Sequence, residues 1–250
     1  MERHGQGWAR LPNNDQYEGN YKRGLRDGMG LYVFKNGARY LGEWHKGKKH
    51  GFGKFYYPDG STYDGEWKND MKNGYGEYTY HNGDTYKGSW LNDKRHSLGT
   101  YTFALDDCKF YGTWQNGVRL GPMEIQHKNH RFHGYWKNSN PFGKGVYSFN
   151  AEHVVKGFIN LVRDPVYDNV KMDDGVENMY TPIWCAKEIL KFDYSLLPEE
   201  PIQLPCEEIP ESICEQSIVP SEDELMEFDK GEEHLEECPC EDVEDTEVFF

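Results

Sequence analysis

The sequence predicts an all-β fold: an extended, twisted antiparallel ribbon of about six to seven tandem β-hairpins, followed by a mostly disordered acidic tail. An aromatic phrase recurs along the chain, as "YLGEW" at 40–44, "YDGEW" at 63–67 and "YKGSW" at 86–90. A glycine-rich phrase recurs in phase with it, and turn dipeptides separate the two. Aromatic residues make up 15% of the chain, within a hydrophobic content of only 36%. The core is therefore expected to be built from rings in a thin layer.

The glycine of the aromatic phrase recurs at a nearly constant interval along the first two thirds of the chain. Self-similarity at such a period, here about 23 residues, is typical of an array of one small supersecondary unit. The glycines in question are Gly19, Gly42, Gly65, Gly88, Gly112, Gly134 and Gly157.

The glycine-rich phrase reads "GMGLYVF" from residue 28, "GFGKFYY" from 51, "GYGEYTY" from 74 and "GKGVYSF" from 143. Asn-Gly and Asp-Gly are strong hairpin signals, because these residues tolerate positive φ. Each unit is therefore predicted to be a strand, a tight turn and a second strand. The turn dipeptides are Asn36-Gly37, Asp59-Gly60 and Asn82-Gly83.

Alternation along a strand places Tyr40, Gly42 and Trp44 on one face, since residues i, i+2 and i+4 point the same way. Asp64 and Glu66 fall on the opposite face, which is predicted to be wet. Glycine between two rings leaves a gap into which a ring from a neighbouring strand can lie. The phrase is therefore interpreted as a packing signature with a structural role. Its members are Tyr17, Gly19, Tyr40, Gly42, Trp44, Tyr63, Gly65, Trp67, Tyr86, Gly88, Trp90, Gly112, Trp114, Gly134 and Trp136.

The pattern departs from this code at both ends. Ser97 stands where the first glycine of a doublet is expected, and Met123 replaces the second glycine of the next. The opening stretch "RHGQGWARLP" holds only the second half of a unit, which leaves open a further strand upstream and makes this fragment the expected place for fraying.

Charge divides the chain into two parts. Residues 1–150 carry 22 Lys and Arg against 15 Asp and Glu, a net charge of +7. Residues 151–250 carry 6 against 28, a net charge of −22. A highly charged segment with few rings cannot bury enough surface to offset the entropy of ordering.

Three segments are predicted from these patterns: a repeat ribbon over 1–158, a transitional segment over 159–197 and a disordered, Pro/Glu-rich tail over 198–250. Within the second, "TPIWCAKEILKF" at 181–192 predicts a short helix, since proline is favoured at the first helical position.

No catalytic residue, cofactor or metal site is predicted. His50 and His96 precede the doublet position in two repeats and are expected to cap loops. The Gly-x-Gly doublets lack the helix and the Gly-Lys-Ser/Thr of a phosphate loop. Cys238 and Cys240 have no partner pair at zinc spacing. The modest positive charge of 1–150, with its rings committed to strands, argues against nucleic acid as a partner.

Two observations indicate a cytosolic setting: the cysteines do not form a disulfide framework, and no secretory signal or membrane-spanning run is visible. An alternative to a scaffold is a peripheral module that binds anionic phospholipid through the compact basic loop "HKGKKHG". Its ligands would be Lys46, Lys48 and Lys49, although the acidic tail would be repelled by a negative membrane.

With both phrases and the period in hand, "YLGEWHKGKKHGFG" and "YDGEWKNDMKNGYG" resemble MORN repeats, over about residues 3–158. More narrowly, "ERHGQGWARLPNNDQYEGNY" and "HKNHRFHGYWKNSNPFGKGVYSF" are similar to MORN proteins of the radial spoke head in motile cilia and sperm flagella. The resemblance implies a non-enzymatic axonemal scaffold that supports motility, with other radial spoke head proteins as partners and the central-pair apparatus nearby. The copy number in such an assembly is left open.

Overall fold

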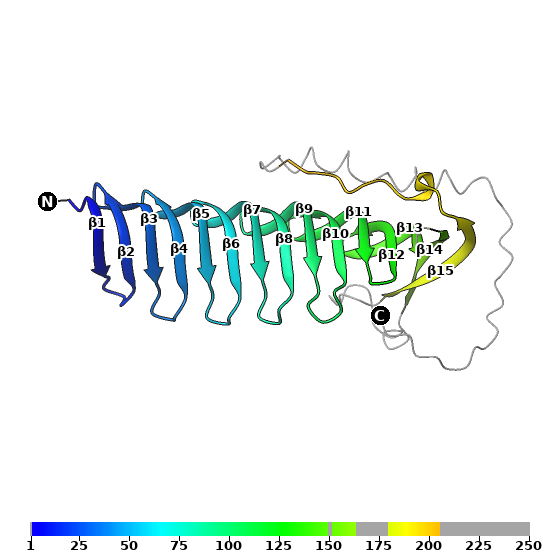
Figure 1. Ribbon diagram of the computed structural model, residues 1–250, viewed down its shortest axis with the longest axis horizontal. Coiled ribbons are helices and arrows are strands. Elements are labelled where there is room, and N and C mark those ends of the chain that lie inside the picture. The colour runs from blue at the N-terminus through cyan, green and yellow to red at the C-terminus, as the bar shows by residue number, and fades with distance from the viewer. Residues whose placement is uncertain (1, 150–151, 164–179, 206–250) are drawn as a thin grey trace. The chain divides into compact units, whose positions relative to one another are not determined.

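The computed structural model describes residues 2–149, 152–163 and 180–205. Within these ranges fifteen strands form one open antiparallel sheet, in which each strand pairs with its neighbours in sequence. Figure 1 shows them side by side in chain order. The strands are β1 (Gly5–Arg10), β2 (Gln16–Lys22), β3 (Leu25–Val33), β4 (Arg39–His45), β5 (Lys48–Tyr56), β6 (Thr62–Lys68), β7 (Met71–Thr79), β8 (Thr85–Leu91), β9 (Lys94–Thr102), β10 (Lys109–Gln115), β11 (Val118–Gln126), β12 (His130–Lys137), β13 (Asn140–Phe149), β14 (His153–Arg163) and β15 (Tyr180–Lys191). The predicted all-β repeat fold is confirmed.

Two kinds of turn alternate along the sheet. The predicted dipeptides lie in the longer turns: the Gly37 amide donates to the Phe34 carbonyl at 2.9 Å, and Gly37 has φ +90°. The other hairpins have two-residue turns that the sequence reading did not single out. In the turn between β6 and β7, Asn69 and Asp70 both have positive φ, as a type I′ turn requires. From β1 to β13, each strand is therefore joined to the next by a short hairpin connection.

The register between strands places the two glycine phrases opposite each other. Gly42 of β4 faces Gly30 of β3 on one side and Gly53 of β5 on the other. Because the side-chain period of a strand is two, this register aligns the rings of all repeats on one face. The opposite face holds the intervening residues, and it is less polar than predicted: Phe52, which lies across from Glu66, is 65% exposed.

The sheet continues past residue 158, and the predicted helix over 181–192 is wrong. Residues 180–191 form β15, which pairs with β14 along its whole length. Trp184 joins the aromatic face, with its ring 5.0 Å from that of Tyr147. The pairing and this packing override a weak helix signal. Pro182 is tolerated because β15 is the last strand of the sheet in the described part of the chain, and proline is accepted at a sheet edge.

The first residues of the predicted disordered tail are ordered against the sheet. After β15 comes a single 3-10 turn, Tyr194–Leu196, and residues 198–205, here called the strap, then run over β9–β12. Leu204 in the strap is only 3% exposed. The prediction for residues 206–250, and the two cysteines at 238 and 240, lie outside the described residues.

Candidate docking site

The Tyr and Trp residues of the repeat signature lie in the core. Tyr40 of β4 packs edge-on against Trp67 of β6, with centroids 5.4 Å apart, and Tyr63 repeats this contact with Trp90 at 5.4 Å. The buried members are Tyr17, Tyr40, Tyr63, Tyr86, Trp44, Trp67, Trp90, Trp114 and Trp136.

The tyrosine hydroxyls and the indole N–H groups of Trp44, Trp67 and Trp90 are satisfied inside the sheet, whereas that of Trp114 is buried without a partner. The Tyr63 hydroxyl donates to the Glu66 carbonyl at 3.0 Å, and the Trp67 indole N–H donates to the Gly53 carbonyl at 3.0 Å. Burial raises the pKa of Tyr17 to about 12, so that its hydroxyl stays protonated and remains a donor. A face whose donors are already paired is a core, with few groups left to recognise a ligand.

The signature glycines let each tyrosine ring lie flat on the sheet. A Cβ added at Gly65 would overlap the Gly76 backbone and stand 2.9 Å from the Tyr63 hydroxyl. The ring above Gly65 thus comes from its own strand, whereas the gap at Gly76 is filled from the neighbouring strand. A ring fills the space next to Gly65, as expected, but this Tyr63 ring covers both Gly65 and Gly76. The same placement holds around Gly19, Gly42 and Gly88, while Gly112 faces Met123 and Gly134 faces Phe132.

A row of basic residues covers the aromatic face, and the sequence reading missed it. The Lys49 ammonium lies 4.2 Å from the Trp67 ring centroid and 4.8 Å from that of Phe55. Burial lowers the pKa of Lys49. The sequence could have predicted this row, because its basic residues recur with the same period as the aromatic phrase. They are Arg26, Lys49, Lys72, Arg95 and Arg119.

The three candidate lipid ligands are therefore not one surface cluster. Lys46 and Lys48 are exposed at the hairpin turn, but Lys49 is committed to the rings of its own repeat and the next. A cation stacked on aromatic faces is held by the ring quadrupoles and is a poor ligand for a phosphate in solvent.

The opposite face carries a docked peptide segment, the strap. The Thr113 hydroxyl donates to the Ile202 carbonyl at 2.8 Å and accepts from the Ile202 amide at 2.9 Å. The Ser97 hydroxyl accepts from the Leu204 amide at 2.8 Å. Side chains of β9 and β10 thereby bind the backbone of an extended segment, which is a mode of recognition that constrains the segment's conformation more than its sequence.

His96 completes these contacts, and its expected role as a loop cap is wrong. It lies inside β9, and its Nε2 is 3.1 Å from the Pro205 carbonyl. Burial lowers the pKa of His96, so that the neutral imidazole donates to this carbonyl through Nε2. His50, the counterpart of His96 two repeats earlier, also lies inside a strand, β5.

Ser97 explains one departure from the repeat code. It has φ +59° at a position where the other repeats have glycine, so a residue with a Cβ is held in the left-handed region. This conformation costs roughly 1 kcal/mol for a non-glycine residue. The hydroxyl that glycine lacks is the group that binds the strap, and the hydrogen bond offsets the strain. The glycines at this position with positive φ are Gly28, Gly51, Gly74, Gly121 and Gly143.

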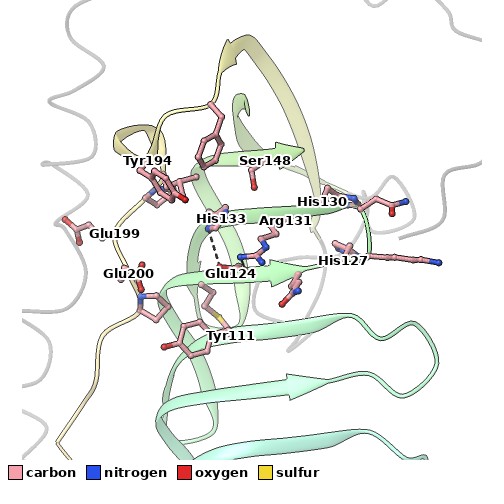
Figure 2. Close-up of a pocket in the computed structure, with 18 residues that line it drawn as sticks. Tyr111, Glu124, His127, His130, Arg131, His133, Ser148, Tyr194, Glu199 and Glu200 are labelled. Carbon is pink, nitrogen blue, oxygen red and sulfur yellow. Dashed lines mark ion pairs between the residues drawn. The ribbon is translucent and has the colours of Figure 1, made fainter. Parts of the chain in front are cut away.

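Between the strap and β10–β13 lies a cavity of about 820 Å³. Figure 2 shows Glu199 and Glu200 on its strap side and Glu124 and Arg131 on its strand side. The Glu124 carboxylate is 3.3 Å from Arg131 Nη1 and 3.8 Å from His133 Nδ1. Burial lowers the pKa of His133 despite this carboxylate. The charges of Glu124 and Arg131 are paired with each other across β11 and β12, so this pair stabilises the face beneath the strap.

A Cys–His pair borders this region. Cys108 Sγ is 4.0 Å from His127 Nε2, but burial raises the pKa of the thiol. A nucleophilic cysteine needs a lowered pKa, and this environment acts in the opposite direction. Among residues 2–149, 152–163 and 180–205, no group of three or more His, Cys, Asp or Glu side chains is arranged to hold a metal ion. In the same part of the chain there is no helix with the length and apolarity to span a membrane.

These features define a class of protein: an open antiparallel repeat sheet with an aromatic core on one face and, on the other, a surface that holds an extended segment of the same chain. The family model described as MORN repeat matches five segments of this sheet: residues 17–39, 40–62, 63–85, 86–104 and 132–151. These five segments of the chain are thus similar to MORN repeats. The interval between the last two matches contains Thr113, whereas His96 and Ser97 lie inside the match over residues 86–104.

Part of the chain is similar to a curated protein. "Radial spoke head 1 homolog" from Mus musculus is 54% identical over 81 residues, which is 32% of this chain and 27% of that protein. The matched region thus spans about a quarter of the relative's length.

Proposed function

We propose that this protein is a non-enzymatic structural scaffold of the axonemal radial spoke head, which supports ciliary and flagellar motility by docking spoke head subunits that face the central pair. The observation that carries the proposal is the 54% identity to a radial spoke head 1 homolog. The proposed location is accordingly the axoneme of a cilium or flagellum. The proposed partners are other radial spoke head proteins.

The physical character of the sheet supports a scaffold. A repeat array in which each strand contacts mainly its neighbours gains surface with every unit. The aromatic face stabilises the array internally, and the strap is an example of an extended chain held by the other face. Together these give a sheet with surface for several partners along its strands.

The test combines location and composition. An affinity-tagged copy of the full chain is expressed in ciliated cells or sperm, imaged in beating axonemes, and purified after axoneme extraction. We expect an axonemal signal and recovery of radial spoke head proteins. Absence of every spoke head protein from the purified material, with the tagged chain present, contradicts the proposal.

The phospholipid alternative is separated by liposome flotation with and without anionic lipid. Lys46 and Lys48 are the exposed residues of the basic loop, so a double change to Ala removes salt-sensitive flotation if lipid is the ligand. A chain that does not float with anionic liposomes at low salt leaves the lipid function without support.

A further inference from the structure

An apolar stripe runs along the face that carries the strap. Met29, Phe52 and Tyr75 each stand between the two glycines of a doublet, and they are 53%, 65% and 53% exposed. They point away from the aromatic core, since each lies next in sequence to a glycine that the core rings cover. Exposed large side chains that recur at one position mark an interaction surface more strongly than scattered ones do.

The stripe continues toward the first strands of the sheet. Trp8 and Leu41, on the same face, are 63% and 48% exposed. Together with Met29 and Leu31 they line a hollow of about 520 Å³. The apolar surface therefore extends from β1 to β7 without an occupant in the described part of the chain.

The strap is an example of the kind of segment that this face binds. Leu98 is the next member of the stripe series after Tyr75, and it is only partly exposed. Its neighbour Ser97 binds the Leu204 amide. The strap offers two aliphatic side chains, Ile202 and Leu204, separated by one residue and flanked by Pro201 and Pro205. The open stripe thus adjoins, on the same face, a segment that is already bound at β9 and β10.

Two of the side chains that bind the strap backbone have polar counterparts beneath the open stripe, whereas Ser97 is replaced there by Gly28, Gly51 and Gly74. Ser89 is the counterpart of Thr113 in the preceding repeat, and His50 is the counterpart of His96. His50 carries a buried Nδ1 that has no hydrogen-bond partner, as does His96, which binds the strap through Nε2. His50 and the stripe residue Phe52 both lie in β5, so His50 is placed to bind a segment on the stripe as His96 binds the strap.

The charges near the stripe favour an apolar ligand over a highly charged one. Lys54 Nζ is 3.2 Å from the Asp64 carboxylate, and Lys87 Nζ is 3.6 Å from that of Glu77. These pairs join neighbouring strands and balance each other. A phosphate backbone or an anionic bilayer requires an excess of positive charge, which this surface does not offer.

We propose that the strap-bearing face over β3–β8 binds an extended segment of a partner protein, with two aliphatic side chains one residue apart and flanking prolines, through Met29, Phe52 and Tyr75. The flanking prolines hold the segment extended before binding, which lowers the entropy lost on docking. The inference deepens the proposed scaffold function and rests on it for the biological setting. Its test uses purified protein, so a failure to bind peptide would not contradict the scaffold function, and a failure of the scaffold function would not contradict peptide binding.

The probe is a fluorescent peptide with the strap sequence "PEEPIQLP", added to the full chain, whose own strap occupies β9–β12. We expect saturable binding by fluorescence anisotropy and new hydrogen-exchange protection in β5–β8. Phe52→Glu should weaken binding at least about tenfold, because it places a charge where an aliphatic side chain docks. Tyr75→Glu should act in the same direction.

Leu105→Glu is the matched control, since Leu105 is 94% exposed in a turn away from the stripe and its replacement leaves peptide binding unchanged. Thermal melts of all variants show whether the fold is retained. If a variant unfolds, the protection map of the unaltered chain still decides. Protection confined to β9–β12, which indicates only displacement of the strap, overturns the proposal. So does equal binding by Phe52→Glu and Leu105→Glu, or no binding at all.

Discussion

The regular repeats of β2–β8 and the irregular repeats of β9–β13 share the same strand pairing but differ in the hydrogen bonds of their buried polar atoms. In the regular part the Trp90 indole N–H donates to the Gly76 carbonyl at 3.2 Å. In the irregular part the indole N–H of Trp114 is buried without a partner. The regular repeats satisfy their indole N–H groups internally, whereas the irregular ones lose one of these hydrogen bonds and bind the strap.

The side chains that break the repeat code are the ones that serve the strap. Ser97 replaces a glycine, and Thr113 stands where Glu43 and Glu66 stand in earlier repeats. Glu66 closes its own repeat by accepting from the Tyr75 amide at 2.9 Å, but Thr113 binds another segment. At the Thr113 position the departure from periodicity therefore accompanies binding, because the periodic glutamate already has an internal partner.

The largest expected effect is a loss of folding stability when a signature glycine is replaced, and it should differ between the regular and the irregular repeats. Gly65→Val should destabilise the sheet by about 3 kcal/mol, because the new side chain meets the Gly76 backbone and the Tyr63 ring. Gly112→Val should cost less, since its nearest neighbour is the flexible Met123 side chain. Urea unfolding monitored by tryptophan fluorescence measures both. Asp64→Val, on the exposed side of the same strand, is the control, and equal losses for Gly65 and Asp64 would contradict the assignment of faces.

Next in size is release of the strap. Thr113→Val removes both hydrogen bonds to Ile202 and should lower the opening free energy of residues 198–205 by about 2 kcal/mol. Hydrogen exchange of the strap should then quicken while exchange in β4–β7 stays unchanged. Thr100→Val, on the same face of β9, provides the comparison. Unchanged strap exchange in the Thr113 variant would show that its hydroxyl does not hold the strap.

The dependence of stability on low pH tests two of the longer turns, those that contain Asp15 and Asp84. The Ala104 amide and the Tyr101 hydroxyl donate to Asp84 and lower its pKa from 3.8, and the Tyr32 hydroxyl does the same for Asp15. A lowered folded-state pKa gives stability that is complete above the ordinary value and is lost as pH falls through the folded value. The melting temperature should therefore fall between about pH 5 and about pH 2. Asp84→Asn should show a shallower fall, and an identical pH profile would count against the carboxylate.

The smallest effect concerns the cation row. Lys72→Met keeps the aliphatic stem over Trp90 but removes the charge, which lies 4.7 Å from the ring centroid. The loss should be below about 1 kcal/mol, because burial already disfavours the charged form and lowers the pKa of Lys72. Lys87→Met, on the other face, is the control by thermal melting. A larger loss for Lys87 would contradict a stabilising role for the charge over the rings.

The sequence by itself determined the repeated hairpins, their turns and the aromatic face. The nearly constant interval between the signature glycines set the unit, and the spacing of Tyr63, Gly65 and Trp67 set the face, because a strand alternates its side chains with period two. The interval and the alternation depend only on residues close in sequence, and they are the same from one repeat to the next. The row of basic residues obeys the same period and was open to the same reasoning.

Tertiary structure alone decided the end of the sheet and the docked strap. Residues 181–192 have a helix-compatible local sequence, and only pairing with β14 makes them a strand. Likewise Ser97 and Thr113 are far in sequence from Leu204 and Ile202, the strap residues that they bind, so no local pattern links them. Contacts between distant segments depend on register and on which backbone groups remain unpaired, and these are fixed only once the strands have assembled.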